Sequence, residues 1–256
     1  MKSNAKPGLL TARDATPAGI TNREGPSLFL LLGDHAGNGV PERLALLGLH
    51  RSELSRHIAL DIGVESLGSH LASELDAPFV SQSYSRLVVD CNRALSHADA
   101  IAAVSDGTPI PGNLELSHDQ RRARADAIYH PYHNAIADLL IERDRRGLRT
   151  IVVSLHSFTP SLGGITRPWQ VGVLYGGGEN SFAKAVLSEF RQSGWAVGDN
   201  LPYQFDDTDL TIPKHAIASG RPYVELEIRQ DMLDTHDAVA ALAKRLRMIL
   251  IEASSQ

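Results

Sequence analysis

The 256-residue chain is predicted to fold as a three-layer α/β/α sandwich with a central mixed, largely parallel sheet. Short apolar, β-branched runs alternate along the whole chain with longer segments of helical periodicity, and no internal repeat interrupts this alternation. A chain with 43% hydrophobic and 21% charged residues can bury one large core. We therefore expect residues 1–256 to form a single domain.

The individual elements follow from local patterns, in chain order. Residues 1–26 are rich in Pro, Gly, Thr and Asn without a sustained period, which predicts an irregular N-terminal arm. Apolar runs predict strands at 28–32, 78–81, 86–90, 150–155, 170–175, 195–197 and 223–228. Helical patterns occupy 42–49, 52–75, 117–146, 181–192 and 235–253, with a capping box at Ser117 and Gln120 and a kink or break before Pro131. Residues 95–116 contain several Gly and Pro and predict a long surface loop.

Charge and cysteine content exclude several classes of function. The formal net charge is -5 and no long basic block is present, which argues against nucleic acid as the main partner. Cys91 is the only cysteine, so no internal disulfide can form, and a cytoplasmic location is the simpler expectation. The apolar runs fall short of the ~20 residues that span a bilayer, and the N-terminus lacks a signal-peptide pattern. We expect a soluble protein.

Three polar groups follow predicted strands directly: His35, the pair Asn92 and Arg93, and His156. A single histidine at the end of a strand is more often a hydrogen-bonded structural residue than a ligand. Open α/β sheets bind ligands at the carboxyl ends of their strands, so several such groups on one sheet edge indicate a functional site.

The predicted strand 223–228 adds carboxylates to this edge. Its period of two places Glu225 and Glu227 on the same face as Tyr223, with Val224 and Leu226 on the other. The alternative interpretation is an edge strand with a solvated face. Beside a divalent metal, a carboxylate at the strand end is suited to act as a general base toward water.

Two histidines need a third ligand to hold a metal. Catalytic zinc commonly takes two histidines and one carboxylate, and the candidates are Asp34, Asp61 and Asn38. Asp61 is expected at the start of a helical segment, where an ordinary helix-starting acid is the competing interpretation. A charged carboxylate binds zinc better than a neutral amide, which favours Asp61 over Asn38.

Four motifs, DHAGNGVP, VVDCNR, LHSF and ELEIRQD, occur in this order between about residues 28 and 232. Together they resemble the N-formylglutamate amidohydrolase family, which is similar in fold and site to the zinc carboxypeptidases. The sequence departs from the zinc carboxypeptidase pattern three residues after His35, where Asn38 replaces a glutamate. The resemblance implies a zinc-carboxypeptidase-like fold.

The resemblance also implies roles for individual residues. It implies that His35, Asp61 and His156 bind Zn²⁺ and that Glu227 is the general base. Asn92 and Arg93 would hold a substrate carboxylate, because a planar guanidinium can donate two parallel hydrogen bonds. Arg86 would polarise the scissile carbonyl, and Arg167 and Tyr203 could line the pocket.

The implied activity is zinc-dependent hydrolysis of a small N-acyl amino acid, most specifically N-formyl-L-glutamate to formate and L-glutamate. The alternatives are a zinc carboxypeptidase or amidase that acts on peptide or cell-wall fragments, and a non-catalytic amino-acid-binding protein on the same fold. The substitution of glutamate by Asn38 keeps the last alternative open. The expected partner is the small N-acyl amino acid substrate, with no nucleic acid and no membrane, and the sequence does not predict an oligomeric state.

Overall fold

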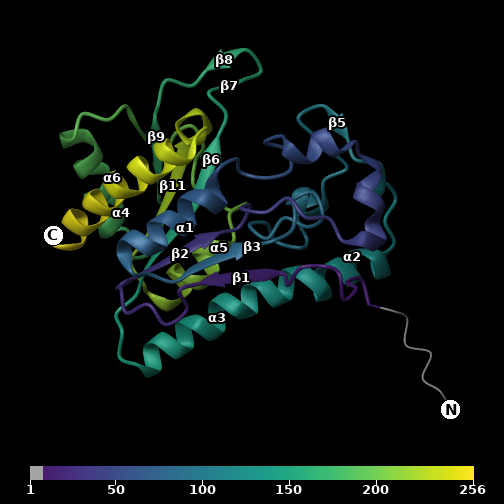
Figure 1. Cartoon of the computed structure of the whole chain (residues 1–256), viewed down its shortest axis with the longest axis horizontal. Helices are drawn as coiled ribbons and strands as arrows, with labels where there is room; N and C mark the ends of the chain where they lie inside the picture. Colours follow the sequence, from purple (N-terminus) through teal and green to yellow (C-terminus); the bar gives the residue numbers. More distant parts are fainter. Residues whose placement is uncertain (1–7) are drawn as a thin grey trace.

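A seven-stranded mixed sheet forms the centre of the molecule in the computed structural model, which describes residues 8–256 (Figure 1). Its spatial order is β1 (Ala18–Thr21), β3 (Phe79–Gln82), β2 (Phe29–Gly33), β6 (Ile151–Phe158), β11 (Tyr223–Arg229), β9 (Val171–Leu174) and β10 (Val197–Asp199). The four strands β3, β2, β6 and β11 are parallel, whereas β1 and the pair β9 and β10 run in the opposite direction. The predicted mixed, largely parallel sheet is confirmed.

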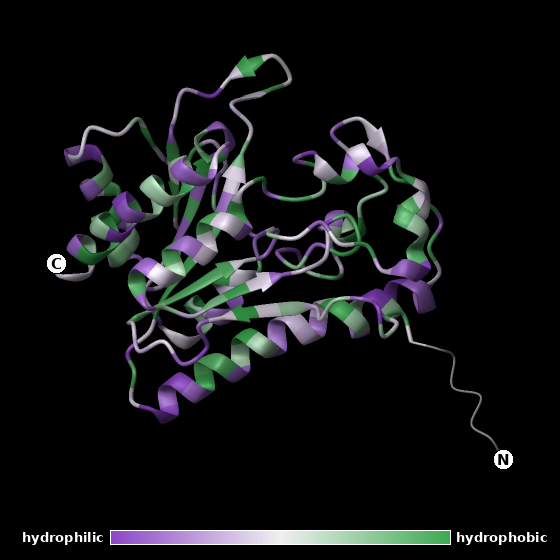
Figure 2. Ribbon diagram, in the orientation of Figure 1, coloured by the Kyte–Doolittle hydropathy of each residue, from purple (hydrophilic) through white to green (hydrophobic). Residues whose placement is uncertain are grey.

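Helices cover both faces of this sheet and complete the three layers. One face packs against α1 (Val64–Leu75), α4 (Ser181–Gln192) and α6 (His236–Ser254). The other packs against α3 (His130–Arg145) and the short α5 (Thr211–His215). Figure 2 shows apolar residues along the central strands and mixed polarity on the surrounding helices, as expected for helices that bury one stripe.

The last strand alternates as its sequence predicts. Leu226 packs in the core shared with α6, whereas Tyr223 packs in the core shared with α3. Because side chains alternate along a strand, Glu225 and Glu227 point to the same side as Tyr223. β11 lies between β6 and β9, so the interpretation of an edge strand with a solvated face is wrong.

The predicted helix at 42–49 and the first part of the one at 52–75 are replaced by short 3-10 turns, η1 (Glu42–Gly48) and η2 (Arg51–Ser55). The second part of 52–75 is helical as predicted. In η1, Ala45 has a φ of 46°, which an α-helix does not accommodate. The α-helix α1 begins only at Val64, after Gly63 with a φ of 83°. Asp61 therefore lies in the connection before α1 and does not start the helix.

Residues 86–90 do not form the predicted strand. The segment turns, with the Val88 amide donating to the Ser85 carbonyl and the Asp90 amide to the Ala100 carbonyl. Val88 and Val89 are buried in the same core as α3, which accounts for their apolar, β-branched character without a sheet ladder. Tertiary packing overrides strand propensity at this point.

The predicted long loop and the helix after it contain more structure than expected. Residues 95–116 include two 3-10 turns, η3 (Ala98–Ile101) and η4 (Pro111–Asn113), and a small hairpin of β4 (Val104–Ser105) and β5 (Thr108–Pro109). The capping box of Ser117 and Gln120 starts α2 (His118–Arg124). A π-helical turn, η5 (Ala125–Tyr129), joins α2 to α3, so the α-helical geometry is interrupted before Pro131 but the helix is not broken there. The π turn supplies the local adjustment that proline requires.

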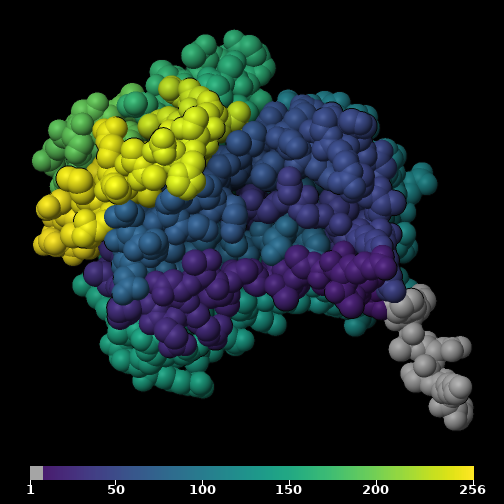
Figure 3. Space-filling model, in the orientation of Figure 1, coloured from purple at the N-terminus to yellow at the C-terminus, as the bar shows by residue number. Residues whose placement is uncertain are grey.

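Part of the predicted N-terminal arm belongs to the sheet. β1 lies within residues 1–26 and pairs antiparallel with β3, and Figure 3 shows this N-terminal stretch at the surface. Residues 1–7 of the arm lie outside the described residues.

Within residues 8–256, no helix is both long and apolar enough to span a membrane. Other short elements are the hairpin β7 (Ser161–Leu162) and β8 (Ile165–Thr166), η6 (Ile217–Ser219) and η7 (Gln230–Leu233).

Candidate metal centre and active site

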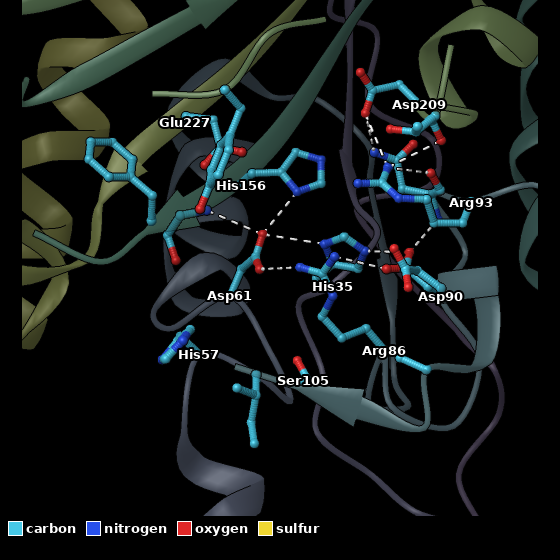
Figure 4. A pocket seen from close by; sticks show the side chains of 18 of the residues that line it. His35, His57, Asp61, Arg86, Asp90, Arg93, Ser105, His156, Asp209 and Glu227 are labelled. Carbon is cyan, nitrogen blue, oxygen red and sulfur yellow. Dashed lines mark hydrogen bonds and ion pairs between the residues drawn. The ribbon is translucent and has the colours of Figure 1, made fainter. Parts of the chain in front are cut away.

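A cavity of about 550 Å³ lies at the carboxyl ends of β2, β6 and β11. His35 follows β2, His156 lies within β6 near its carboxyl end, and Glu227 lies on β11. All three line the cavity together with Asp61, which the connection before α1 supplies. Figure 4 shows Asp61 between the two imidazoles, with Glu227 beside His156.

The two imidazoles and the Asp61 carboxylate converge closely. Asp61 Oδ2 lies 2.9 Å from His156 Nδ1 and 3.5 Å from His35 Nδ1. The backbone supports this arrangement, because the Asp61 amide donates to the His35 carbonyl at 2.9 Å. All three side chains are buried, and a potential ligand atom from each lies within 4.8 Å of the others.

This cluster fits a divalent metal. His35 Nδ1 is buried without a hydrogen-bond partner, and it points toward the same carboxylate as His156 Nδ1. Burial raises the pKa of Asp61, but the two histidines outweigh burial and hold its pKa well below the usual range. An ionised carboxylate with two imidazoles is a common catalytic zinc set. His35, Asp61 and His156 could therefore hold one metal ion.

The far nitrogen of His35 is held by Asp90. Asp90 Oδ1 lies 2.7 Å from His35 Nε2 and also accepts the Asn92 amide at 2.9 Å. Arg86 donates to the other oxygen of Asp90 at 2.8 Å, and its second terminal nitrogen lies 3.5 Å from Asp61. A carboxylate on Nε2 keeps the proton there, which leaves Nδ1 of His35 free to bind a metal.

The far nitrogen of His156 faces a second group of polar side chains. Ser154 Oγ lies 3.1 Å from His156 Nε2, two residues earlier on the same face of β6. Asp34 Oδ2 lies 3.7 Å from that nitrogen and has no hydrogen-bond partner of its own. Tyr132, from α3, donates to Asp34 Oδ1 at 2.7 Å. Asp34 thus lies behind His156, on the side away from Asp61.

The three candidates for the third ligand are separated by their positions. Asp61 is the candidate that joins the cluster of His35 and His156. Asp34 contacts the opposite nitrogen of His156. The Asn38 amide is exposed and donates to the Leu54 carbonyl at 3.0 Å.

Two glutamates of β11 face the cavity beside His156. Glu227 is the direct register partner of His156, and Glu225 is the partner of Ser154. Burial raises the pKa of Glu225 to about 7 and that of Glu227 well above its usual value, against the opposing effect of His156. Glu225 Oε2 and Glu227 Oε2 are buried without a hydrogen-bond partner. Glu225 can therefore bind a proton near neutral pH, and burial also favours the protonated form of Glu227.

A glycine beside Glu227 lets the backbone of Leu201 approach β9 closely. Gly172 of β9 pairs with Glu227, and a side chain at this position would meet the Leu201 carbonyl at 2.2 Å. Only a residue without Cβ permits this approach. The segment that follows Leu201 supplies Tyr203 and Asp209 to the cavity wall.

Asn92 and Arg93 line the cavity, and Figure 4 shows Arg93 next to Asp209, across the site from Glu227. Arg93 Nη1 donates to Asp209 Oδ1 at 3.3 Å, and Asn92 Nδ2 donates to the same oxygen at 3.4 Å. Asn92 Oδ1 accepts the backbone amides of Leu210 and Thr211. The two residues predicted to hold a substrate carboxylate thus already contact a carboxylate of the chain.

Arg167 does not lie directly on the cavity, although it is predicted to line it. Its guanidinium donates to Tyr203 Oη at 3.0 Å and lies 4.9 Å from the centre of the Tyr203 ring. It also donates to Thr159 Oγ1 at 3.4 Å. Tyr203 and Thr159 line the cavity, whereas Arg167 is not among the described residues that do. Arg167 therefore supports the cavity wall from behind.

Fold and site together define a class of three-layer α/β/α proteins with a candidate metal centre at the carboxyl edge of a mixed sheet. The model of the N-formylglutamate amidohydrolase family matches residues 27–233, and the chain belongs to this family.

Solved structures support the same assignment of fold. A gene product from Agrobacterium tumefaciens is 32% identical with a TM-score of 0.93, and the match covers 96% of this chain and 98% of that chain. The N-formylglutamate amidohydrolase from Ralstonia eutropha JMP134 is 17% identical with a TM-score of 0.65, over 94% of this chain and 98% of that chain. No curated protein matches the chain.

Three residues of the site, Asp90, Ser154 and Asp209, are not predicted from the sequence as functional candidates. Asp90 stands within VVDCNR, two residues before Asn92. The prediction of a strand at 86–90 gives no indication that Asp90 contacts His35. Ser154 is two residues before His156, so the strand period could have placed both on one face. Asp209 lies in an irregular segment, and no local pattern connects it with Arg93.

Proposed function

We propose that the protein hydrolyses the amide bond of a small N-acyl amino acid in a metal-dependent reaction, most specifically N-formyl-L-glutamate to formate and L-glutamate. The observation that carries this proposal is the convergence of His35, Asp61 and His156 beside Glu227 in one cavity. Family membership supports the substrate class, because the family is described by hydrolysis of N-formylglutamate.

The metal is proposed to be Zn²⁺, held by Nδ1 of both histidines and by Asp61. A zinc ion in this place would lower the pKa of a bound water toward ~7 and polarise the scissile carbonyl. Asp90 and Ser154 hold the far nitrogens of the two histidines. They orient both rings before any metal arrives, which reduces the reorganisation needed for binding.

Glu227 is proposed as the general base and later the general acid. Its Oε2 is buried and unpartnered, so a proton taken from the attacking water can reside there. The same oxygen then delivers the proton to the departing nitrogen. Burial raises the pKa of Glu227, whereas a cation next to His156 favours the ionised form, which a base requires.

Arg86 is proposed to stabilise the oxyanion that forms on the carbonyl oxygen. Asp90 and Asp61 fix its guanidinium in place, and its side chain is 28% exposed toward the cavity. A fixed donor needs little reorganisation when charge develops. Asn92 and Arg93 are proposed to bind a substrate carboxylate on the other side, with Tyr203, supported by Arg167, closing the wall.

A hydrolysis screen tests this proposal. Purified protein should be assayed on N-formyl-L-glutamate, other N-formyl amino acids, N-acetyl-L-glutamate and short peptides, with and without a chelator. We expect turnover of N-formyl-L-glutamate that the chelator abolishes and added zinc restores. Preference for peptides or cell-wall fragments would instead identify the alternative amidase, and bound metal without turnover of any substrate would identify a binding protein.

A further inference from the structure

The carboxylate of Asp209 lies where the proposed function places the carboxylate of the substrate. Both side-chain donors of the proposed subsite, Arg93 Nη1 and Asn92 Nδ2, point to the same oxygen, Asp209 Oδ1. The Asp209 side chain is 10% exposed and that of Arg93 is 22% exposed, so the pair is largely screened from solvent. An internal acid therefore already accepts from one terminal nitrogen of Arg93 and from the Asn92 side chain.

The backbone next to Asp209 is anchored without the help of this side chain. Asn92 Oδ1 accepts the amides of Leu210 and Thr211 at 3.0 and 2.9 Å. The Thr208 carbonyl accepts from Arg93 Nη1 at 3.2 Å. These contacts keep the segment on Asn92 and Arg93 when the Asp209 side chain rotates away.

The remaining contact of the Asp209 carboxylate is local. Its Oδ2 accepts the Asp206 amide at 3.1 Å. Burial raises the pKa of Asp209 against the effect of Arg93, so the ionised carboxylate is less well solvated here than in water. Release of the side chain exchanges these hydrogen bonds for contacts with water.

We propose that Asp209 is a specificity-determining residue that occupies the carboxylate subsite of Asn92 and Arg93 until a substrate carboxylate displaces it. This inference rests on the proposed function for the position of that subsite. A ligand carboxylate offers the guanidinium and the Asn92 side chain a charged acceptor of the same kind as Asp209 and can replace it, whereas a neutral amide cannot replace the ion pair. Asp209 thereby lowers the affinity for ligands with a carboxylate, because they must displace it. Ligands without a carboxylate cannot displace it and are excluded.

The competition lowers the apparent affinity for carboxylates in proportion to the fraction of protein with an open subsite. If the subsite is open about one tenth of the time, removal of the competing charge tightens binding about tenfold. Asp209→Asn removes that charge and keeps an oxygen that can accept the Asp206 amide. Asp207→Asn is the matched control, because Asp207 is exposed on the same segment and its loss changes the net charge equally.

The test is calorimetric titration of the zinc-loaded protein with L-glutamate, succinate and acetate. We expect Asp209→Asn to bind L-glutamate about tenfold more tightly than the unaltered protein, and Asp207→Asn to bind it equally. In the Arg93→Ala background, Asp209→Asn should give no gain, because the gain requires the guanidinium. Asp209→Ser provides a second variant, and circular dichroism establishes that each variant is folded.

Equal or weaker binding by Asp209→Asn and Asp209→Ser would overturn the inference, since Asp209 would then only position Arg93. Failure of all three carboxylates to bind any variant would overturn it as well. The proposed reaction is judged separately: a gain in carboxylate binding without hydrolysis of N-formyl-L-glutamate rejects the reaction and keeps the role of Asp209.

Discussion

Glu227 and His156 are direct register partners on the neighbouring parallel strands β11 and β6. Residues paired in this way point to the same face of a sheet. The pairing of two strands therefore places the proposed base next to a proposed metal ligand, although the residues are far apart in sequence. No loop conformation is needed to bring them together.

Glu227→Gln is expected to retain zinc and the fold but to lose turnover by about 10²- to 10⁴-fold, the usual contribution of a general base. The amide has nearly the shape of the carboxylate but cannot take the proton from water. Steady-state kinetics with N-formyl-L-glutamate and zinc analysis of the same preparation measure both effects. Turnover near that of the unaltered protein would reject the role of Glu227.

Glu225→Gln is the matched variant, because Glu225 lies on the same strand and face and is similarly buried. Its register partner is Ser154 and not His156. We expect a clearly smaller loss of turnover than for Glu227→Gln. Equal losses of turnover in Glu225→Gln and Glu227→Gln would indicate that turnover depends on the combined negative charge of the two glutamates and not on Glu227 as the base.

Asp61→Ala is expected to abolish stable zinc binding, because it removes the carboxylate that lies between His35 and His156. Asn38→Ala should retain zinc fully, since the Asn38 amide contacts the Leu54 carbonyl and not the cluster. Metal content after dialysis, together with competition against a chromophoric chelator, distinguishes the two. Loss of zinc in Asn38→Ala and not in Asp61→Ala would reverse the choice of ligand.

Asp90→Asn is expected to weaken zinc binding by about 10- to 100-fold, the usual effect of removing a group that orients a histidine ligand. Asp90 accepts from His35 Nε2 and also holds Arg86. Ser154→Ala should give a smaller loss, because Asp34 remains close to His156 Nε2. Chelator competition on folded protein measures both affinities independently of activity, and unchanged affinity in Asp90→Asn would contradict the orienting role.

A buried pair of histidines away from the cavity should make the fold sensitive to acid. His133 Nδ1 lies 2.9 Å from His215 Nε2, and His133 Nε2 lies 3.0 Å from the Cys91 carbonyl oxygen. Because a carbonyl only accepts, His133 Nε2 carries a proton and His133 Nδ1 accepts from His215. Burial lowers the pKa of His133 to about 3 and that of His215 to about 4, with Lys214 contributing repulsion.

Both histidines have an ordinary pKa of 6.5, so below this pH the unfolded chain binds protons that the folded chain does not. Their contribution to stability is complete above pH 6.5 and is lost progressively as the pH falls toward 4. Each histidine can remove about 1.4 kcal/mol per pH unit in this window. Urea unfolding at pH 7.5 and 4.5 should show a smaller acid loss in His133→Gln/His215→Gln than in the exposed control His118→Gln. Equal acid losses would contradict this assignment.

The sequence predicts the sheet and the residues at its carboxyl edge because both depend on local patterns. The alternation in YVELEIR places Glu225 and Glu227 correctly, and the apolar run before His156 is a strand. The mixed, largely parallel character of the sheet also follows from the alternation of β and α segments. In such segments the pattern of buried and exposed positions can be recognised from consecutive residues.

Other parts of the site depend on contacts that no local pattern contains. Residues 86–90 have the composition of a strand, but their valines are buried in a helix-facing core and Asp90 turns toward His35. Asp209 meets Arg93 across a large separation in sequence. The position of Asp61 depends on its amide bonding the His35 carbonyl, which a helix starting at Asp61 would not predict.

The reversed direction of β9 has a consequence for how this scaffold can change. β9 begins at the same end of the sheet at which β11 finishes, so the hairpin of β7 and β8 that precedes it lies toward the rim of the cavity. Exchange of this hairpin for a longer or shorter one would leave the strands that carry the reacting groups untouched. The rim of the cavity can thus be altered without a change in the strands that hold His156 and Glu227.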